Sequence, residues 1–219
     1  SLVTFDPSFP SPMKARLLTA LSALLLILPA ARAALPSGAE IKGAFDALDA
    51  DRNAAVSLAE WEKASFALFR SADKNNDNTL DPSELGGTAI TRDTFLLIDE
   101  DHNGRLSVAE FMRLRRTVFT AADIDHDDSL TFVEFELLTL LAQTGWTDRN
   151  HNGRIEPSEL KAALVQAFGQ LDTDHDGFLS AAEAAYMVPE QFKLSDDNHD
   201  DRLTQDEFVR GYLKALGAL

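Results

Sequence analysis

Residues 172–183 place oxygen-bearing side chains at alternate positions of a short run, an arrangement suited to holding a hard cation. The run reads Asp-Thr-Asp-His-Asp-Gly-Phe-Leu-Ser-Ala-Ala-Glu and matches the pattern D-x-[DN]-x-[DN]-G-x5-E without substitution. Calcium takes roughly six to eight oxygen ligands at about 2.3–2.6 Å. Here the oxygens come from positions 1, 3, 5, 9 and 12 and from the backbone carbonyl of position 7. Gly177 at position 6 permits the sharp turn.

The same twelve-residue pattern occurs seven times at nearly constant spacing. The loops, numbered one to seven along the chain, begin at Asp49, Asp73, Asp99, Asp123, Asp148, Asp172 and Asp196, with 24 to 26 residues between successive starts. Every loop has Asp at position 1, Asp or Asn at positions 3 and 5, and Glu at position 12. Seven matches in register exclude coincidence and predict seven cation sites.

The predicted metal ligands occupy positions 1, 3, 5, 7, 9 and 12, where position 9 often acts through a water. They are Asp49, Asp51, Asn53, Ala55, Ser57 and Glu60 in loop one; Asp73, Asn75, Asp77, Thr79, Asp81 and Glu84 in loop two; Asp99, Asp101, Asn103, Arg105, Ser107 and Glu110 in loop three; Asp123, Asp125, Asp127, Ser129, Thr131 and Glu134 in loop four; Asp148, Asn150, Asn152, Arg154, Glu156 and Glu159 in loop five; Asp172, Asp174, Asp176, Phe178, Ser180 and Glu183 in loop six; and Asp196, Asn198, Asp200, Arg202, Thr204 and Glu207 in loop seven.

Position 6 ranks the loops, because the turn there favours a residue that tolerates positive φ. Loops three, five and six have Gly, and loops two, four and seven have Asn or Asp, which tolerate positive φ fairly well. Loop one has Ala54, for which the left-handed conformation costs about 1–2 kcal/mol. We therefore expect loop one to be the weakest or an empty site, and loops three and six, followed by loop five, to match best.

The charge of the chain follows from these loops. The chain has 36 acidic and 20 basic side chains, a net charge of −16, and 24 of the 36 acidic residues fall at ligand positions. A nucleic-acid partner is not expected, because phosphate binding requires a basic surface. No Ser/His/Asp set or acid pair stands apart from the loops, so the sequence predicts no enzyme activity. The five histidines all occupy loop position 4, where a solvated turn residue is the expectation and a pH-sensing or second-metal role the alternative.

Helices are predicted on both sides of the loops. A Phe lies four residues before every loop except loop five, which has Thr144, and apolar stripes such as Leu160, Leu164, Phe168 and Leu171 recur at helical spacing. Five loops begin an S/T-x-x-E capping box at position 9, so each loop is expected to end by starting a helix. An aliphatic residue at position 8 predicts a short two-stranded bridge between paired loops. The expected fold is an all-α array of seven helix-loop-helix units.

The helices between loops must be shared. Only about twelve residues separate consecutive loops, so one helix of roughly 24 Å leaves one loop and enters the next. Two loops joined by an unbroken helix would lie at opposite ends of it and could not pair. Gly86-Gly87, Gly145 and Pro189 interrupt the second, fourth and sixth connections. This alternation indicates duplication of a unit of about 49 residues, with the final loop left over.

The beginning of the chain is typical of an export signal. Lys14 and Arg16 follow Met13, an apolar run extends over 17–28, and the small-residue site Ala31-Arg32-Ala33 comes next. The run is shorter than the roughly 20 residues needed to span a bilayer, which leaves a retained anchor as the alternative. We assign residues 1–33 to an N-terminal extension and signal peptide, with 1–12 read as a start-site artefact, and 34–219 to the loop array. Without cysteine, stabilisation by metal rather than by disulfides in a periplasmic or extracellular location is expected.

These loops resemble those of the EF-hand family, and the chain is similar over residues 38–219 to bacterial secreted proteins with several EF-hands. The resemblance implies up to seven calcium ions as the cofactors. A protein partner of unknown identity is possible, whereas the acidic charge and the removal of the signal predict no nucleic-acid partner and no membrane contact. The short spacing is also similar to that of the lanthanide-binding lanmodulins. Those proteins carry Pro at loop position 2, whereas this chain has residues such as Ala50 and Thr173 there, which favours calcium. An incoming helix separates the pattern from dockerin-like repeats.

Three functions are compatible with this resemblance. The first is an exported calcium buffer or store, favoured by seven sites and a signal peptide. The second is a sensor that exposes an apolar groove to a protein partner on binding calcium; such grooves are often rich in methionine, and the mature chain has only Met112 and Met187. The third is a lanthanide-binding protein.

Overall fold

The computed structural model describes residues 35–85 and 92–218 of the chain. The predicted signal peptide and Gly86-Gly87 lie outside these residues. The helices are α2 (Gly38–Leu48), α3 (Leu58–Ala72), α4 (Arg92–Ile98), α5 (Val108–Ala122), α6 (Phe132–Thr144), α7 (Pro157–Leu171), α8 (Pro189–Ser195) and α9 (Gln205–Ala215). The strands are β1 (Ala55–Ser57), β2 (Thr79–Leu80), β3 (Leu106–Ser107), β4 (Ser129–Thr131), β5 (Phe178–Ser180) and β6 (Arg202–Thr204).

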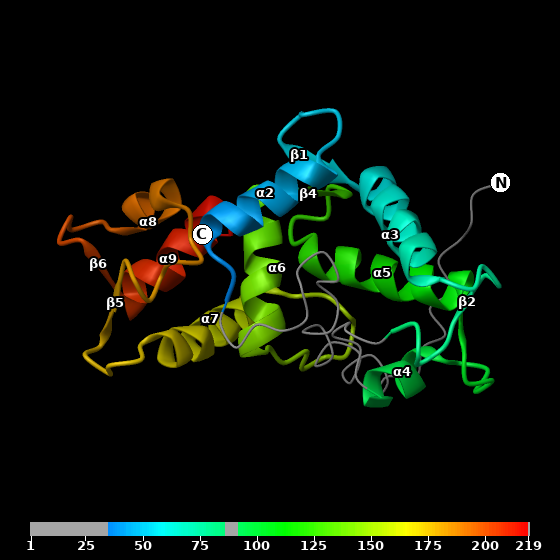
Figure 1. Ribbon diagram of the computed structural model, residues 1–219. Coiled ribbons are helices and arrows are strands. Elements are labelled where there is room, and N and C mark those ends of the chain that lie inside the picture. Colours follow the sequence, from blue (N-terminus) through cyan, green and yellow to red (C-terminus); the bar gives the residue numbers. More distant parts are fainter. Residues whose placement is uncertain (1–34, 86–91, 219) are drawn as a thin grey trace.

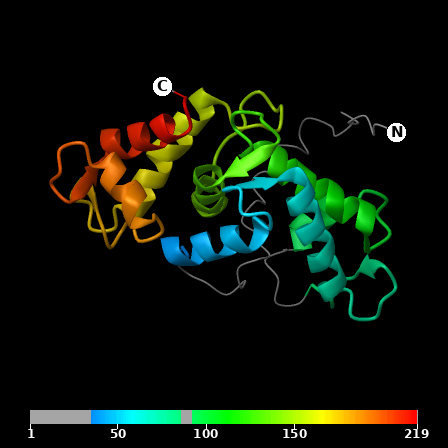
Figure 2. The same cartoon turned by 90° about the horizontal axis from the view of Figure 1, so that it is seen from above.

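The helices form two groups on either side of α6 (Figures 1 and 2). In one group α3 packs against α5, and in the other α7 packs against α9 and α8 against α9. Helix α6 contacts α2, α5 and α7 and so joins the two groups. None of the helices in the described residues is long and apolar enough to cross a membrane.

Capping explains where the helices begin and end. Four helices begin with a cap residue whose hydroxyl accepts a hydrogen bond from the backbone N–H of the position-12 Glu: Ser57, Ser107, Thr131 and Thr204. The carboxylate of that Glu in turn accepts a bond from the backbone N–H of the cap residue, which completes the predicted capping boxes. Such a cap stabilises a helix by about 1 kcal/mol. At the other end of a shared helix the N–H of the next Asp bonds the carbonyl of the preceding Phe, as between Asp73 and Phe69 at 2.9 Å. The loop residues thus fix both helix ends.

The strands pair the loops in a nested order. Strand β1 of loop one pairs with β4 of loop four, β2 of loop two pairs with β3 of loop three, and β5 of loop six pairs with β6 of loop seven, all antiparallel. In each pair the two position-8 residues face each other: Val56 with Leu130, Leu80 with Leu106, and Leu179 with Leu203. All six of these side chains are completely buried. The predicted bridges are therefore present in six loops.

The shared helices behave as predicted. Helices α3, α5 and α7 have 15 residues each, about 22 Å of helix, and hold the two loops that they join at opposite ends. Because α3 and α5 pack together, loop one meets loop four at one end of the pair and loop two meets loop three at the other. The unit of loop, helix and loop agrees with the predicted duplication of about 49 residues.

The expectation that every loop starts a helix is wrong for loops two and six in the described residues. Residues 82–85 at the end of loop two and 181–186 at the end of loop six form turns, and the next described helices begin at Arg92 and Pro189. Each of these two loops pairs with its successor along the chain. A helix continuing from the cap would carry the next loop to the far end, so the tertiary pairing overrides the local capping signal.

The core is built largely from the aromatic residues next to the loops. Phe45, Phe69, Phe95, Phe119 and Phe168, each four residues before a loop, are buried, and Phe192 is half-buried. Edge-to-face and tilted ring contacts connect the helices, such as Phe69 with Phe111 at 5.5 Å and Phe168 with Phe208 at 5.9 Å between ring centres. These contacts stabilise each helix pair beyond the apolar area that it buries.

Candidate metal sites

The Asp at position 1 is buried in every loop. All seven of these side chains are at most 8% exposed. In loop one, Asp49 accepts hydrogen bonds from the backbone N–H groups of Asn53 and Ala54, both at 3.0 Å, and in loop three Asp99 accepts the same two bonds from Asn103 and Gly104. The turn therefore folds around a carboxylate that is held away from solvent.

The Glu at position 12 closes the loop from the other side. In loop one, one oxygen of Glu60 accepts the N–H of Ala50 at 2.8 Å, and the other accepts the N–H of Ser57 at 2.9 Å and its hydroxyl at 2.7 Å. Loops three, four and six repeat this arrangement with Glu110, Glu134 and Glu183. Each carboxylate oxygen has further lone pairs, so the Glu can cap the helix and still ligate a cation.

The hydrogen bonds and the burial act in opposite directions on these carboxylates. Hydrogen bonds from the backbone and side chain of Ser180 lower the pKa of Glu183 to about 2, and those from Ser57 lower the pKa of Glu60. In loop four, burial raises the pKa of Asp123 and of Glu134. Burial therefore disfavours the ionised carboxylates of loop four, and a bound cation would offset this free-energy cost.

Carboxylate oxygens converge in four loops. In each, one oxygen from position 1, one from position 3 and one from position 12 lie within 4.8 Å of one another: Asp49, Asp51 and Glu60; Asp99, Asp101 and Glu110; Asp123, Asp125 and Glu134; and Asp172, Asp174 and Glu183. These are the loops with Asp at position 3, whereas loops two, five and seven have Asn there. Loop one belongs to this set although Ala54 occupies its position 6, with φ at 69°.

Loop six provides the direct test of whether a cation fits. The Oδ1 atom of Asp172 is buried and has no hydrogen-bond partner among the described residues. In the other six loops the corresponding oxygen accepts the N–H of position 5. A buried, unpaired carboxylate oxygen is costly, and Asp172 is the residue that forms a triad with Asp174 and Glu183. Hard oxygen donors in this number suit calcium, so the residues fit the ion that the pattern predicts.

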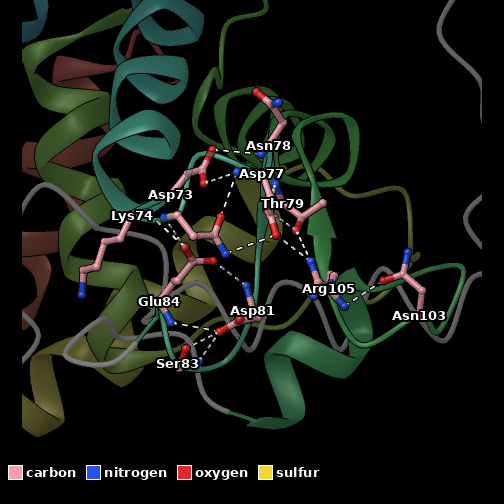
Figure 3. Close-up of polar contacts among 11 residues, drawn as sticks. Asp73, Lys74, Asp77, Asn78, Thr79, Asp81, Ser83, Glu84, Asn103 and Arg105 are labelled. Atoms are coloured by element: carbon pink, nitrogen blue, oxygen red, sulfur yellow. Dashed lines mark hydrogen bonds and ion pairs between the residues drawn. The ribbon is translucent and has the colours of Figure 1, made fainter.

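Loop two has an arginine from loop three beside its ligands (Figure 3). A guanidinium nitrogen of Arg105 lies 2.6 Å from an oxygen of Asp77 and 3.3 Å from the hydroxyl of Thr79. The other Asp77 oxygen accepts the N–H of Thr79 at 2.9 Å and its hydroxyl at 2.7 Å. Hydrogen bonds from Thr79, with a smaller contribution from the charge of Arg105, lower the pKa of Asp77. A cation in loop two would meet a carboxylate that is already partly neutralised.

Loops five and seven also engage their own ligands. In loop seven, Arg202 lies 3.1 Å from Asp200 and its guanidinium lies over the Phe178 ring at 3.9 Å from the ring centre. In loop five, the two oxygens of Glu156 accept the side-chain amides of Asn150 and Asn152, both at 2.7 Å. In loops five and seven, a predicted ligand carboxylate is therefore already paired with other side chains of the same loop.

One requirement of the loops was not anticipated from the sequence. Position 4 has positive φ in all seven loops, between 56° and 63°, where the residues are Arg52, Asn76, His102, His126, His151, His175 and His199. All five histidines are exposed, in agreement with the expectation of a solvated turn residue. Asn and His are enriched among residues that adopt this conformation, a signal that the sequence offered.

Two buried polar groups away from the loops were also missed. Arg115 lies over the Trp61 ring at 4.1 Å and donates to the Ser65 hydroxyl, and burial lowers its pKa to about 10. Tyr212 donates to Glu136 at 2.8 Å, and burial raises the pKa of Glu136 to about 7. Each contact joins single residues on different helices, so no repeated spacing in the sequence indicated it. Both connect helices, α3 with α5 and α6 with α9.

Helix-loop-helix units that gather carboxylate oxygens define a class of proteins that bind divalent cations. Four segments of the chain, 67–86, 91–114, 148–165 and 164–183, match the family model described as EF hand, and they cover loops two, three, five and six. These four matches support an EF-hand calcium-binding protein. No curated protein matches the chain.

Proposed function

We propose that all seven loops bind calcium and that the chain serves as an exported calcium buffer or store. The observation that carries this proposal is the convergence of buried carboxylates in loops one, three, four and six, with an unpaired Asp172 oxygen in the last of them. Loops two, five and seven share the backbone turn and the position-1 and position-12 bonds, which supports their assignment as sites of the same kind.

A buffer role is supported by how the apolar surface is arranged. Met187 is buried and Met112 is half-buried against the core, so neither is presented to a partner. The large apolar side chains that are exposed, Phe66, Leu96 and Leu194 among them, lie on different helices. A sensor would use a contiguous groove of flexible apolar residues. The alternative, a calcium-triggered partner-binding module, is one of the outcomes that the test below can give.

Cation binding is expected to stabilise the fold. The ligand positions hold 24 of the 36 acidic side chains, and like charges brought together in the loops oppose compaction. Free energy of cation binding then becomes free energy of folding. We expect the chain to be looser in chelator and to gain helix content as calcium is added.

The test is a calorimetric titration of the chelator-treated full chain with calcium and, in parallel, with lanthanum. Up to seven calcium ions bound per chain, with helicity by circular dichroism rising alongside, is the expected result. A dye that reports apolar surface separates buffer from sensor, because strong dye binding on calcium addition would contradict the buffer role. A large preference for lanthanum would favour the lanthanide-binding alternative, and no uptake of either ion at millimolar levels would refute the proposal.

Export is supported by residues 13–33 alone, where a basic start precedes an apolar run and a small-residue site. If this assignment is right, the protein recovered from outside the cytoplasm begins just after Ala33. The mass of the exported chain checks the cleavage site. Recovery of the uncleaved chain in the membrane fraction would instead support the retained anchor.

A further inference from the structure

We propose that the exposed face of helix α3, together with Lys74 just beyond its C-terminal end, docks on an anionic lipid surface when the loops hold calcium. The proposal concerns an interaction surface and so goes beyond cation binding, although its dependence on calcium rests on the proposed function. It follows from the residues that α3 exposes, from a comparison with helix α7 and from the total charge of the chain.

The exposed residues of α3 lie at helical spacing, and none of them is acidic. We define the α3 stripe by six exposed residues on this face: Ala59, Lys63, Phe66, Ala67, Arg70 and Lys74. Three of the six are cations, in a chain that has 36 acidic and 20 basic side chains. The stripe is therefore a basic surface on an acidic protein.

The acids near the stripe are engaged elsewhere. Glu62 is half-buried and pairs with Arg116 of the neighbouring helix α5. Arg70 donates to the side-chain oxygen of Asn78 at 2.9 Å, an uncharged partner, and lies 3.8 Å from the buried Asp73. A cation bound in loop two would engage Asp73, which leaves the charge of Arg70 to the stripe.

The other members of the stripe reach into solvent. Figure 3 shows the Lys74 side chain extended away from the ligand residues of loop two. Lys63 is exposed, and Phe66 is 48% exposed although it is a large apolar side chain. An aromatic ring between cationic side chains suits a lipid surface, because the ring enters the headgroup layer while the cations contact phosphates.

Helix α7 provides an internal comparison, because it leads into loop six as α3 leads into loop two. Its exposed face also has a large apolar residue, Val165, at the place that Phe66 has in α3. The three cations do not recur, and the equivalent residues are Ala162, Gly169 and Thr173. The gathering of cations is therefore a property of α3 and not of the repeated unit.

A flat anionic surface fits the stripe better than a peptide does. Eleven residues separate Lys63 from Lys74, about 16 Å of helix, and the cations lie along a convex face. Peptides are usually held in grooves or along strand edges. A cavity of about 430 Å³ lies between the start of α2 and helix α8, and no residue of the stripe lines it. A plane of lipid phosphates can meet all three cations at once.

The charge of the whole chain makes this docking depend on calcium. The metal-free chain has a net charge of −16, so an anionic surface repels it. The absence of membrane contact expected from the sequence applies to this state. Divalent cations in the seven loops would cancel most of the negative charge, and the stripe could then approach the lipid without long-range repulsion.

The experiment measures cosedimentation of the full chain with vesicles of phosphatidylglycerol and phosphatidylcholine in equal parts, with calcium uptake measured on the same samples. We expect binding in saturating calcium at low salt, and little binding in chelator or to phosphatidylcholine alone. Lys63→Glu reverses one charge of the stripe and should weaken binding about tenfold or more. Lys161→Glu makes the same change on the exposed face of α7 and should have little effect.

A second pair of variants tests the aromatic ring. Phe66→Ser should weaken vesicle binding several-fold, because it removes the apolar group that enters the headgroup layer. Val165→Ser is the matched control on α7 and should leave binding unchanged. Calcium uptake by both variants shows that each one is folded, so a loss of vesicle binding can be assigned to the surface.

Three outcomes overturn the docking. The first is a wild-type chain that takes up calcium and does not bind the anionic vesicles. The second is equal binding by Lys63→Glu and Lys161→Glu, which would assign the contact to calcium bridges between acidic groups and lipid phosphates. The third is complete displacement from the vesicles by polyglutamate at equal charge, which would make an acidic polypeptide the preferred partner.

Failure of the proposed function gives a different result. A chain that takes up no calcium overturns the proposed function and the calcium dependence of docking with it. The comparison of Lys63→Glu with Lys161→Glu on the same vesicles still decides whether the α3 stripe is the docking surface.

Discussion

The pair formed by loops two and three is equivalent in the chain to the pair formed by loops six and seven. Each pair has an arginine at the same position, but the two arginines form ion pairs with different loops. Loop six starts 99 residues after loop two and loop seven 97 residues after loop three, so Arg105 and Arg202 are both position 7 of the later loop. Arg105 crosses to Asp77 of loop two (Figure 3), while Arg202 stays with Asp200 of its own loop.

The position-7 residue of the partner loop, which contacts the arginine, explains the difference. Position 7 of loop two is Thr79, whose hydroxyl lies 3.3 Å from Arg105, and position 7 of loop six is Phe178, whose ring lies under Arg202. The aromatic ring holds the guanidinium away from Asp176, the counterpart of Asp77. Loop six therefore keeps its full ligand charge, and loop two shares it with a side chain. One residue outside the acidic set thus changes the electrostatics of a site.

The largest expected effect is loss of the closing carboxylate in loop six. Glu183→Gln removes a charge and an oxygen from a converged triad, and it should weaken that site about 100-fold, or ~2.7 kcal/mol. Glu84→Gln in loop two should have a smaller effect, because the site it closes is already partly neutralised. Calorimetric titration of both variants checks this order, and Glu190→Gln, in the first turn of α8, is the control. Equal losses at the two loops would contradict the comparison.

Backbone strain is the next largest effect. Gly177 has φ at 85° with no atom within 4 Å of a built Cβ, so Gly177→Ala would be opposed by conformation rather than by a clash. We expect it to lower the free energy of unfolding in calcium by about 1 kcal/mol. Gly169→Ala in helix α7, which also meets no atom, should instead stabilise the chain by up to about 1 kcal/mol. Urea unfolding measures both, and destabilisation by both would argue against the conformational cause.

Removing the arginine that crosses between loops should have a smaller effect. Arg105→Ala frees Asp77 and is expected to tighten loop two by a few-fold, in the range of about 0.2–1 kcal/mol measured for exposed ion pairs. Arg105→Lys retains a positive charge and should give a smaller gain. Calcium titration of both variants decides, and a weaker loop two in Arg105→Ala would show that the arginine orients Asp77 instead of competing for it.

The smallest effect is a dependence on pH in the metal-free chain. Hydrogen bonds from Ser180 depress the pKa of Glu183 from its ordinary 4.5 to about 2, so they stabilise the fold above about pH 4.5 and lose their effect as the pH falls toward 2. Ser180→Ala should be slightly less stable than the wild type at neutral pH, and the difference should shrink over this range. Thermal unfolding in chelator across acidic pH measures it, and a difference that does not change with pH would point to packing as the cause.

Much of the loop architecture could be predicted from residue types at fixed spacing. The caps at Ser57, Ser107, Thr131 and Thr204, the buried Phe before the loops and the bridges at position 8 depend on local chemistry and appear where expected. The length of the shared helices correctly excluded pairing between the loops that they join. These features need no knowledge of how distant segments meet.

The remaining features depend on that knowledge. The bridge between loops one and four joins segments about 74 residues apart, and nothing local in Val56 or Leu130 specifies the partner. The direction taken by Arg105 depends on Thr79, which comes within hydrogen-bonding distance only after the loops have paired. The turns after loops two and six likewise follow from pairing, against the capping signal at Ser180. Sequence spacing defines each unit, and contacts between units decide how they assemble.

Helix α6 belongs to both halves of the molecule, although Gly145 just after it looks like a natural place to divide the chain. Its Glu136 carboxylate receives the Tyr212 hydroxyl, and Tyr212 in turn lies 3.3 Å from the hydroxyl of Tyr186. A fragment starting after Gly145 would leave Tyr212 without that acceptor, and the complementary fragment would leave the Glu136 carboxylate without its donor. Cutting the chain at this glycine would therefore remove a contact between α6 and α9 and would not give two independent domains. Experiments on this protein need the full chain.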